Sequence, residues 1–270
     1  MHLKRWITGL TALPILIVLI FKGGTLSFTL LVAIVCVLAL WEYFRIVFNH
    51  RTDLLKDPIL MLAFIFGPVI IWSAHKNSFD AILALVSLNL MISGFISLTR
   101  FKSDALVFET VFKQVLGLIY IPFFLSYLIF IRNGINGAAW IFSLLFIVFA
   151  GDTCALYAGS FLGRRKLCPS VSPGKTIEGA VGGLAANLGM GAILKGFFLS
   201  TSPWGCSIIF FLSVGIAGQV GDLFESEIKR SSNVKDSGGI LPGHGGMLDR
   251  IDAILFTAPV AYFFKTYLLS

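Results

Sequence analysis

The sequence predicts an all-α fold, a polytopic membrane bundle of about nine transmembrane helices. Three observations lead to this prediction: 57% of the 270 residues are hydrophobic, only 13% are charged, and the mean hydropathy is +0.89. Soluble proteins carry roughly 25% charged residues. A membrane-spanning helix needs about 20 apolar residues, so nine of them would take up about two thirds of the chain. This leaves no room for a soluble domain of ordinary size.

The expected helices are apolar runs that end at charged residues or at Gly and Pro. They cover residues 6–21, 25–44, 58–74, 79–98, 106–131, 137–161, 177–200, 204–225 and 251–269. The first run resembles a signal peptide, but no small-residue cleavage site follows it, so we expect a retained helix. Glu109 and Lys113 lie in the first turns of the fifth run, and residues 105–114 are expected to lie along the interface before the chain enters the bilayer at Leu116. Eight or ten helices remain alternatives.

Basic residues lie mainly on one side of this predicted bundle. The N-terminus and every second connection together hold 16 of the 21 lysines and arginines, and the opposite side holds four. Because basic loops stay in the cytoplasm, we expect the N-terminus and the sixth and eighth loops inside, and the C-terminus outside, in the inner (cytoplasmic) membrane. Topology therefore explains the net charge of +7 and argues against a nucleic-acid partner.

Acidic residues are distributed differently. Eight of the 14 lie from residue 152 onward. A carboxylate within a membrane is costly and is usually functional, so we expect residues 1–150 to form a scaffold and residues 151–270 to form the catalytic region. Glu42 lies outside that region and is interpreted as a local ion-pair partner of Arg45. The four cysteines lie far apart without a CxxC pair, which argues against a disulfide framework and a structural zinc site.

The segment 226–252 has the composition of a phosphate site. Its four cations are Lys229, Arg230, Lys235 and Arg250. Arginine binds phosphate oxygens through a bidentate fork and lysine binds them as a point charge, while glycines let backbone N–H groups approach an anion. Asp222 lies near the end of the eighth run and Asp249 begins the ninth, so we expect them to share a hard cation such as Mg²⁺. The alternative is an ordinary charged cytoplasmic loop.

A second candidate site lies between residues 151 and 179. Ser172 followed by Pro173 predicts the N-cap and first position of the seventh helix, whose free N–H groups would attract phosphate beside Lys175 and Thr176. Gly-Lys-Thr also ends a nucleotide P-loop, but Pro169 stands where that motif requires glycine, and no strand is expected before it. The alternative is a helix start with snorkelling basic residues.

These segments resemble the phosphatidate cytidylyltransferases, also called CDP-diacylglycerol synthases. The signature positions of that family are filled by Ser226, Ile228, Lys229, Arg230, Lys235, Asp236, Gly238, Leu241, Pro242, His244, Gly245, Gly246, Met247, Asp249, Arg250, Ile251 and Asp252. The stretches 151–153 and 172–179 are similar to the upstream region of the family. The resemblance is specific over residues 150–270. Over the rest of the chain, only the hydropathy pattern is similar to that of the family.

The resemblance implies Mg²⁺-dependent transfer of CMP from CTP to phosphatidic acid, which forms CDP-diacylglycerol and pyrophosphate for phospholipid synthesis. It implies that Asp222 and Asp249 hold the metal, with a second cation left open, and that both act in catalysis with Lys229 and Arg250. The implied substrate-binding residues are Asp152, Ser172, Lys175, Thr176, Glu178, Arg230, Lys235, Asp236, His244, Gly245, Gly246 and Asp252. The nucleophile is already anionic, so His244 and Asp236 are expected to be positioning groups.

Two other classes of membrane protein fit the sequence less well. A secondary transporter for an anionic solute would show an inverted repeat and charges at the midplane, whereas the charges here gather at one predicted interface. A CDP-alcohol phosphotransferase would show Asp-Gly-x-x-Ala-Arg, which is absent. The expected partners are CTP, phosphatidic acid and the bilayer, and the lipid is expected to enter beside the eighth and ninth helices. The oligomeric state is open, with a homodimer as one alternative.

Overall fold

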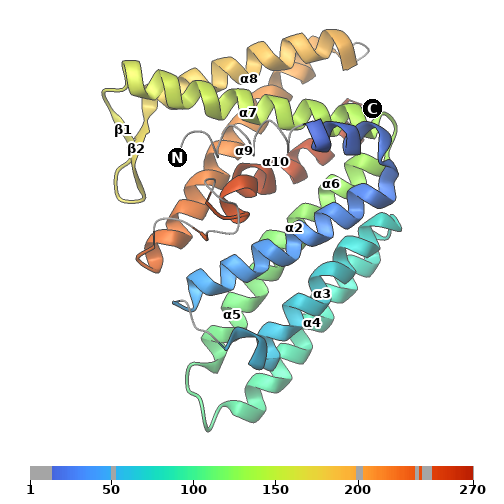
Figure 1. The fold of residues 1–270 in the computed structure, drawn as a ribbon, viewed down its shortest axis with the longest axis vertical. Helices are drawn as coiled ribbons and strands as arrows, with labels where there is room; N and C mark the ends of the chain where they lie inside the picture. Colours follow the sequence, from blue (N-terminus) through green and yellow to red (C-terminus); the bar gives the residue numbers. More distant parts are fainter. Residues whose placement is uncertain (1–13, 50–52, 199–202, 235–236, 239–244, 270) are drawn as a thin grey trace.

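A computed structural model describes residues 14–49, 53–198, 203–234, 237–238 and 245–269 (Figure 1). The described chain is a helical bundle with one short hairpin of strands. After a helix over residues 14–22, the elements are α2 (Gly24–Val47), η1 (Leu54–Lys56), α3 (Pro58–His75), α4 (Phe79–Arg100), α5 (Val107–Leu118), η2 (Ile119–Phe123), α6 (Phe124–Asn133), α7 (Gly137–Leu162), β1 (Lys166–Cys168), β2 (Ser172–Thr176), α8 (Ile177–Phe198), α9 (Trp204–Ser231) and α10 (Leu248–Tyr267).

The predicted fold class is confirmed. Within the described residues, seven helices are long and apolar enough to cross a membrane. The helix α10 matches the ninth predicted run, but it begins with charged residues and is not among the seven. The first run is described only from residue 14. The count of nine membrane spans therefore stays a prediction.

The fifth predicted run forms one continuous helical segment from Val107 to Asn133. The interfacial placement of residues 105–114 stays a prediction. Pro122 has no N–H group to donate within a helix. A single π-helical turn, η2, accommodates it and lets the helix continue into α6.

The C-terminal helices pack closely because small residues line their contacts. In Figure 1, α7 and α8 lie side by side, and α9 and α10 lie between them and the group α2 to α6. A Cβ atom added to Gly221 on α9 would lie 2.6 Å from the Asp252 carbonyl oxygen on α10. This close approach brings the neighbouring Asp222 to the start of α10. At the same contact between α9 and α10, Tyr120 of η2 packs edge-on against Phe224 of α9 and Phe256 of α10.

Candidate functional site

The segment before α8 is a strand and not the start of the helix. Residues Ser172–Thr176 pair with Lys166–Cys168 as an antiparallel hairpin. The prediction that Ser172 caps the seventh helix is therefore wrong. Thr176 takes that role, because its Oγ1 accepts a hydrogen bond from the Gly179 N–H at 3.1 Å. Pairing with β1 occupies backbone groups of residues that were expected to form the first helical turn. Pro173 is tolerated in β2 because both strands of a two-stranded hairpin are edge strands.

Glu178 ties this hairpin to the end of α7. Its Oε2 accepts hydrogen bonds from the backbone N–H groups of Arg164 at 3.0 Å and Arg165 at 3.2 Å. The carboxylate thus holds the turn that precedes β1. A direct contact of Glu178 with substrate stays a prediction.

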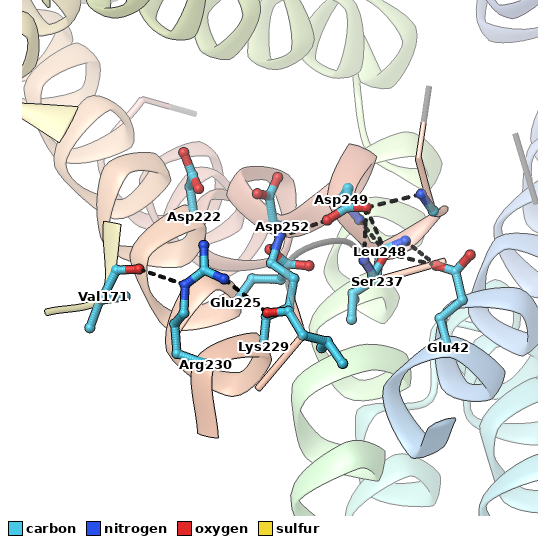
Figure 2. Close-up of polar contacts among 12 residues, drawn as sticks. Glu42, Val171, Asp222, Glu225, Lys229, Arg230, Ser237, Leu248, Asp249 and Asp252 are labelled. Carbon is cyan, nitrogen blue, oxygen red and sulfur yellow. Dashed lines mark hydrogen bonds and ion pairs between the residues drawn. The ribbon is translucent and has the colours of Figure 1, made fainter. Parts of the chain in front are cut away.

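A cavity of about 370 Å³ lies between α7, the hairpin, α8 and α9. Five predicted site residues line it: Asp152, Ser172, Lys175, Thr176 and Asp222. The Lys175 Nζ lies 2.7 Å from Asp222 Oδ2, so a cation of the hairpin meets a carboxylate of α9. Arg230 adds a second link, since its Nε donates to the Val171 carbonyl oxygen at 3.2 Å (Figure 2). The structure therefore brings the two sequence segments together.

Asp249, in the first turn of α10, is held by hydrogen bonds on both of its oxygens (Figure 2). Lys229 Nζ donates to Oδ1 at 2.7 Å. The Oδ2 atom accepts from the Ser237 N–H at 3.1 Å, the Ser237 Oγ at 2.8 Å and the Gly246 N–H at 2.9 Å. Burial by itself raises the pKa of Asp249, but the hydrogen bonds from Lys229 and Gly246 outweigh it and lower this pKa to about 2. The group is therefore a carboxylate at neutral pH.

Glu225 lies one turn before Lys229 on α9 and was not predicted as a site residue. Its side chain is fully buried and forms an ion pair with Lys229. Its Oε2 faces the Lys229 ammonium, and its Oε1 has no partner within the part of the chain that the structure describes. Figure 2 shows Glu225 and Asp252 near the end of the Lys229 side chain. The signal that could have found Glu225 is its position as the last residue of the apolar run 204–225, because a carboxylate within a membrane is usually functional.

The predicted metal ligands face lysines. Asp222 pairs with Lys175 and Asp249 pairs with Lys229. Among the described residues, no group of three or more His, Cys, Asp or Glu side chains is arranged to hold a metal ion. The donor chemistry nevertheless fits Mg²⁺, because the carboxylates at the facing ends of α9 and α10 offer oxygen atoms only. The shared metal site of Asp222 and Asp249 stays a prediction.

The remaining predicted site residues lie at or near the start of α10, or outside the described residues. Arg250 is exposed in the first turn of α10, and Asp252 Oδ1 accepts a hydrogen bond from the Ala253 N–H at 2.8 Å. Gly245 has a φ of 77°, a left-handed backbone conformation that favours glycine. Lys235, Asp236 and His244 lie outside the described residues.

Glu42 contacts the signature segment, and its interpretation as a partner of Arg45 is wrong. Its side chain on α2 is 1% exposed, whereas Arg45 is exposed. Glu42 Oε2 accepts hydrogen bonds from the Leu248 N–H at 2.8 Å and from Ser237 Oγ at 3.2 Å. The rule that flags Glu225 also applies to Glu42, since its run is otherwise apolar up to Trp41.

Comparisons with known proteins show the family of the chain. The sequence model of the cytidylyltransferase family matches residues 3–268. The chain is 33% identical over 267 residues to a phosphatidate cytidylyltransferase of Bacillus subtilis, covering 96% of each chain. It is 31% identical over 261 residues to the Staphylococcus aureus protein of that name, covering 95% of this chain and 96% of the relative. For the Thermotoga maritima protein, the identity is 38% over 184 residues, which cover 64% of this chain and 66% of the relative.

Proposed function

Because the chain belongs to the cytidylyltransferase family, we propose that it transfers CMP from CTP to phosphatidic acid and releases pyrophosphate. The contact between Lys175 and Asp222 beside one cavity supports this most directly. It joins the hairpin to α9, the helix that continues into the signature segment. The names of the relatives from B. subtilis and S. aureus support phosphatidate as the acceptor. The product is CDP-diacylglycerol, an intermediate for phospholipid synthesis.

The reaction is an in-line displacement at the α-phosphorus of CTP. An anionic oxygen of the lipid phosphate forms the new P–O bond while the bond from the α-phosphorus to the bridging β-oxygen breaks, and pyrophosphate leaves with that electron pair. A phosphate monoester loses its second proton at a pKa of about 6, so no strong general base is needed. Lys175, Lys229 and Arg250 stabilise the negative charge that spreads over the phosphoryl oxygens.

Mg²⁺ is the cofactor that this function requires, and Asp222 and Asp249 are the residues that would hold it. The cation would neutralise phosphate charge and polarise the reacting phosphoryl group. Lys175 and Lys229 each place a positive charge beside one of the two carboxylates. A second cation beside the buried Glu225 remains open.

The lipid enters from the bilayer and CTP from the cytoplasm. Leu156 lines the cavity, and this apolar side chain is 70% exposed on α7. This exposed apolar side chain suits contact with a lipid chain, which supports entry beside α7. The route beside α9 and α10 that the sequence suggested stays a prediction. The site faces the cytoplasm of the inner membrane, in accordance with the positions of the basic loops.

The test uses purified protein in detergent with Mg²⁺, phosphatidate and CTP labelled on either the α- or the γ-phosphate. We expect the α-label to enter a chloroform-soluble product and the γ-label to be released into water as pyrophosphate. EDTA should stop the lipid labelling and the release of pyrophosphate. Transfer of the γ-label to lipid would identify a kinase instead. No lipid labelling from either nucleotide would favour the transporter.

A further inference from the structure

Glu42 connects the N-terminal helices to the signature segment. It lies on α2, in the part of the chain that the sequence predicts to be scaffold. Its Oε2 accepts hydrogen bonds from Ser237 Oγ and the Leu248 N–H, which lie 195 and 206 residues further along the chain. Glu42 is thus a long-range contact to the site.

Stability alone does not explain this carboxylate. Glu42 is buried, makes no ion pair among the described residues, and its Oε1 has no hydrogen-bond partner there. Burying a charged group without an opposite charge costs free energy, and a well-packed apolar side chain at the same place would avoid that cost. A side chain retained at such a cost needs a purpose other than packing.

The backbone of the signature segment lies directly on the Glu42 carboxylate. A Cβ atom added to Gly238 would lie 2.6 Å from Glu42 Oε1, and one added to Gly246 would lie 2.5 Å from Oε2. A side chain at either position would displace the Glu42 carboxylate. Glu42 therefore defines where the two described ends of the segment, Ser237–Gly238 and Gly246–Leu248, lie against α2.

Through these contacts Glu42 reaches Asp249. Ser237 Oγ lies between the two carboxylates, 3.2 Å from Glu42 Oε2 and 2.8 Å from Asp249 Oδ2. The hydroxyl has one proton and donates it to one carboxylate at a time. The Leu248 N–H, held by Glu42, belongs to the residue directly before Asp249. Two short paths therefore join Glu42 to the position of Asp249.

We propose that Glu42 is a positioning residue of the transferase site, which orients Asp249 by holding Ser237 and the Leu248 N–H. Glu42 touches no substrate and acts through these two groups. The inference rests on the proposed function, in which Asp249 acts directly at the phosphates.

The test compares Glu42→Gln with Glu109→Gln, a matched control on α5 whose carboxylate is exposed and paired with Lys113. A hydrogen bond to a charged group contributes enough that its loss lowers a rate about tenfold to a hundredfold. We expect a fall of that size in kcat for Glu42→Gln, a smaller change in KM for CTP, and no change for the control. Amide hydrogen exchange at Leu248 should become faster in Glu42→Gln only.

A double-mutant cycle with Ser237→Ala separates positioning from general stability. If Glu42 acts through Ser237, the double variant loses less activity than the sum of the two single losses, expressed as free energies. The inference would be overturned if folded Glu42→Gln kept the wild-type kcat. It would also be overturned if this variant had a lower melting temperature but an unchanged kcat and unchanged hydrogen exchange at Leu248. Either result would leave the proposed function standing. An inactive wild-type protein would instead overturn the proposed function.

Discussion

The Lys175 Nζ and the Asp222 Oδ2 lie 2.7 Å apart and join the β1–β2 hairpin to α9 beside the cavity. Both side chains are partly exposed, at 25% and 36%, whereas the Lys175 Nζ atom itself is buried against Asp222. An incoming phosphate would compete with Asp222 for the lysine, and a metal ion would compete with Lys175 for the carboxylate. In the proposed function, the pair therefore holds both groups in place before either ligand binds.

Replacing Lys175 should weaken the transferase reaction. Lys175→Gln removes a cation that faces the phosphates, and losing one such electrostatic contact lowers turnover by about a hundredfold. The measurement is the initial rate of lipid labelling from α-labelled CTP. Lys166→Gln is the matched control, because Lys166 is an exposed residue of β1 in the same hairpin. Equal rates for the two variants would remove Lys175 from the site.

The two predicted metal ligands should both be essential. Asp222→Asn and Asp249→Asn keep the size of each side chain but remove its charge, so we expect turnover to fall by about a hundredfold or more in each. The variants should stay folded in detergent, as judged by size-exclusion chromatography. Asp80→Asn, at an exposed position in the first turn of α4, is the control. Near wild-type activity of either variant at saturating Mg²⁺ would show that its carboxylate is not a ligand.

Close packing of α9 against α10 should make Gly221 sensitive to substitution. The Cβ of Gly221→Ala would meet the Asp252 carbonyl oxygen at 2.6 Å, and such overpacking costs about 1–3 kcal/mol. Gly189→Ala on α8 is the control, since nothing lies within 4 Å of its added Cβ. Because alanine favours the helix, this control should keep or raise the thermal unfolding temperature in detergent while Gly221→Ala lowers it. Identical melting curves would contradict the observed contact.

The predicted orientation can be tested with a reporter that is active only in the cytoplasm. Fused after Ser270 it should be inactive, and fused before Met1 it should be active, because 16 of the 21 basic residues lie on the side of the N-terminus. Activity at both ends would mean an even number of membrane spans.

The sequence by itself determined the helices and the family. Length and hydropathy are local properties of about 20 residues, so the predicted run 79–98 lies close to α4 (Phe79–Arg100), and the predicted run 137–161 lies close to α7 (Gly137–Leu162). The signature residues were also readable, because their identities and spacing lie within one segment. Where charged and polar side chains interrupt this pattern, at Ser172 and Glu42, the local interpretation was wrong.

Only the tertiary structure decided which groups meet. Pairing with β1 made Ser172–Thr176 a strand, and packing of α2 against the start of α10 turned Glu42 toward Leu248 and away from Arg45. The physical reason is that a buried polar group takes its partner from whatever element packs against it, and that element can lie 206 residues away. Hydropathy places a helix in the membrane, whereas the direction of a carboxylate within the bundle depends on the packing of all its neighbours.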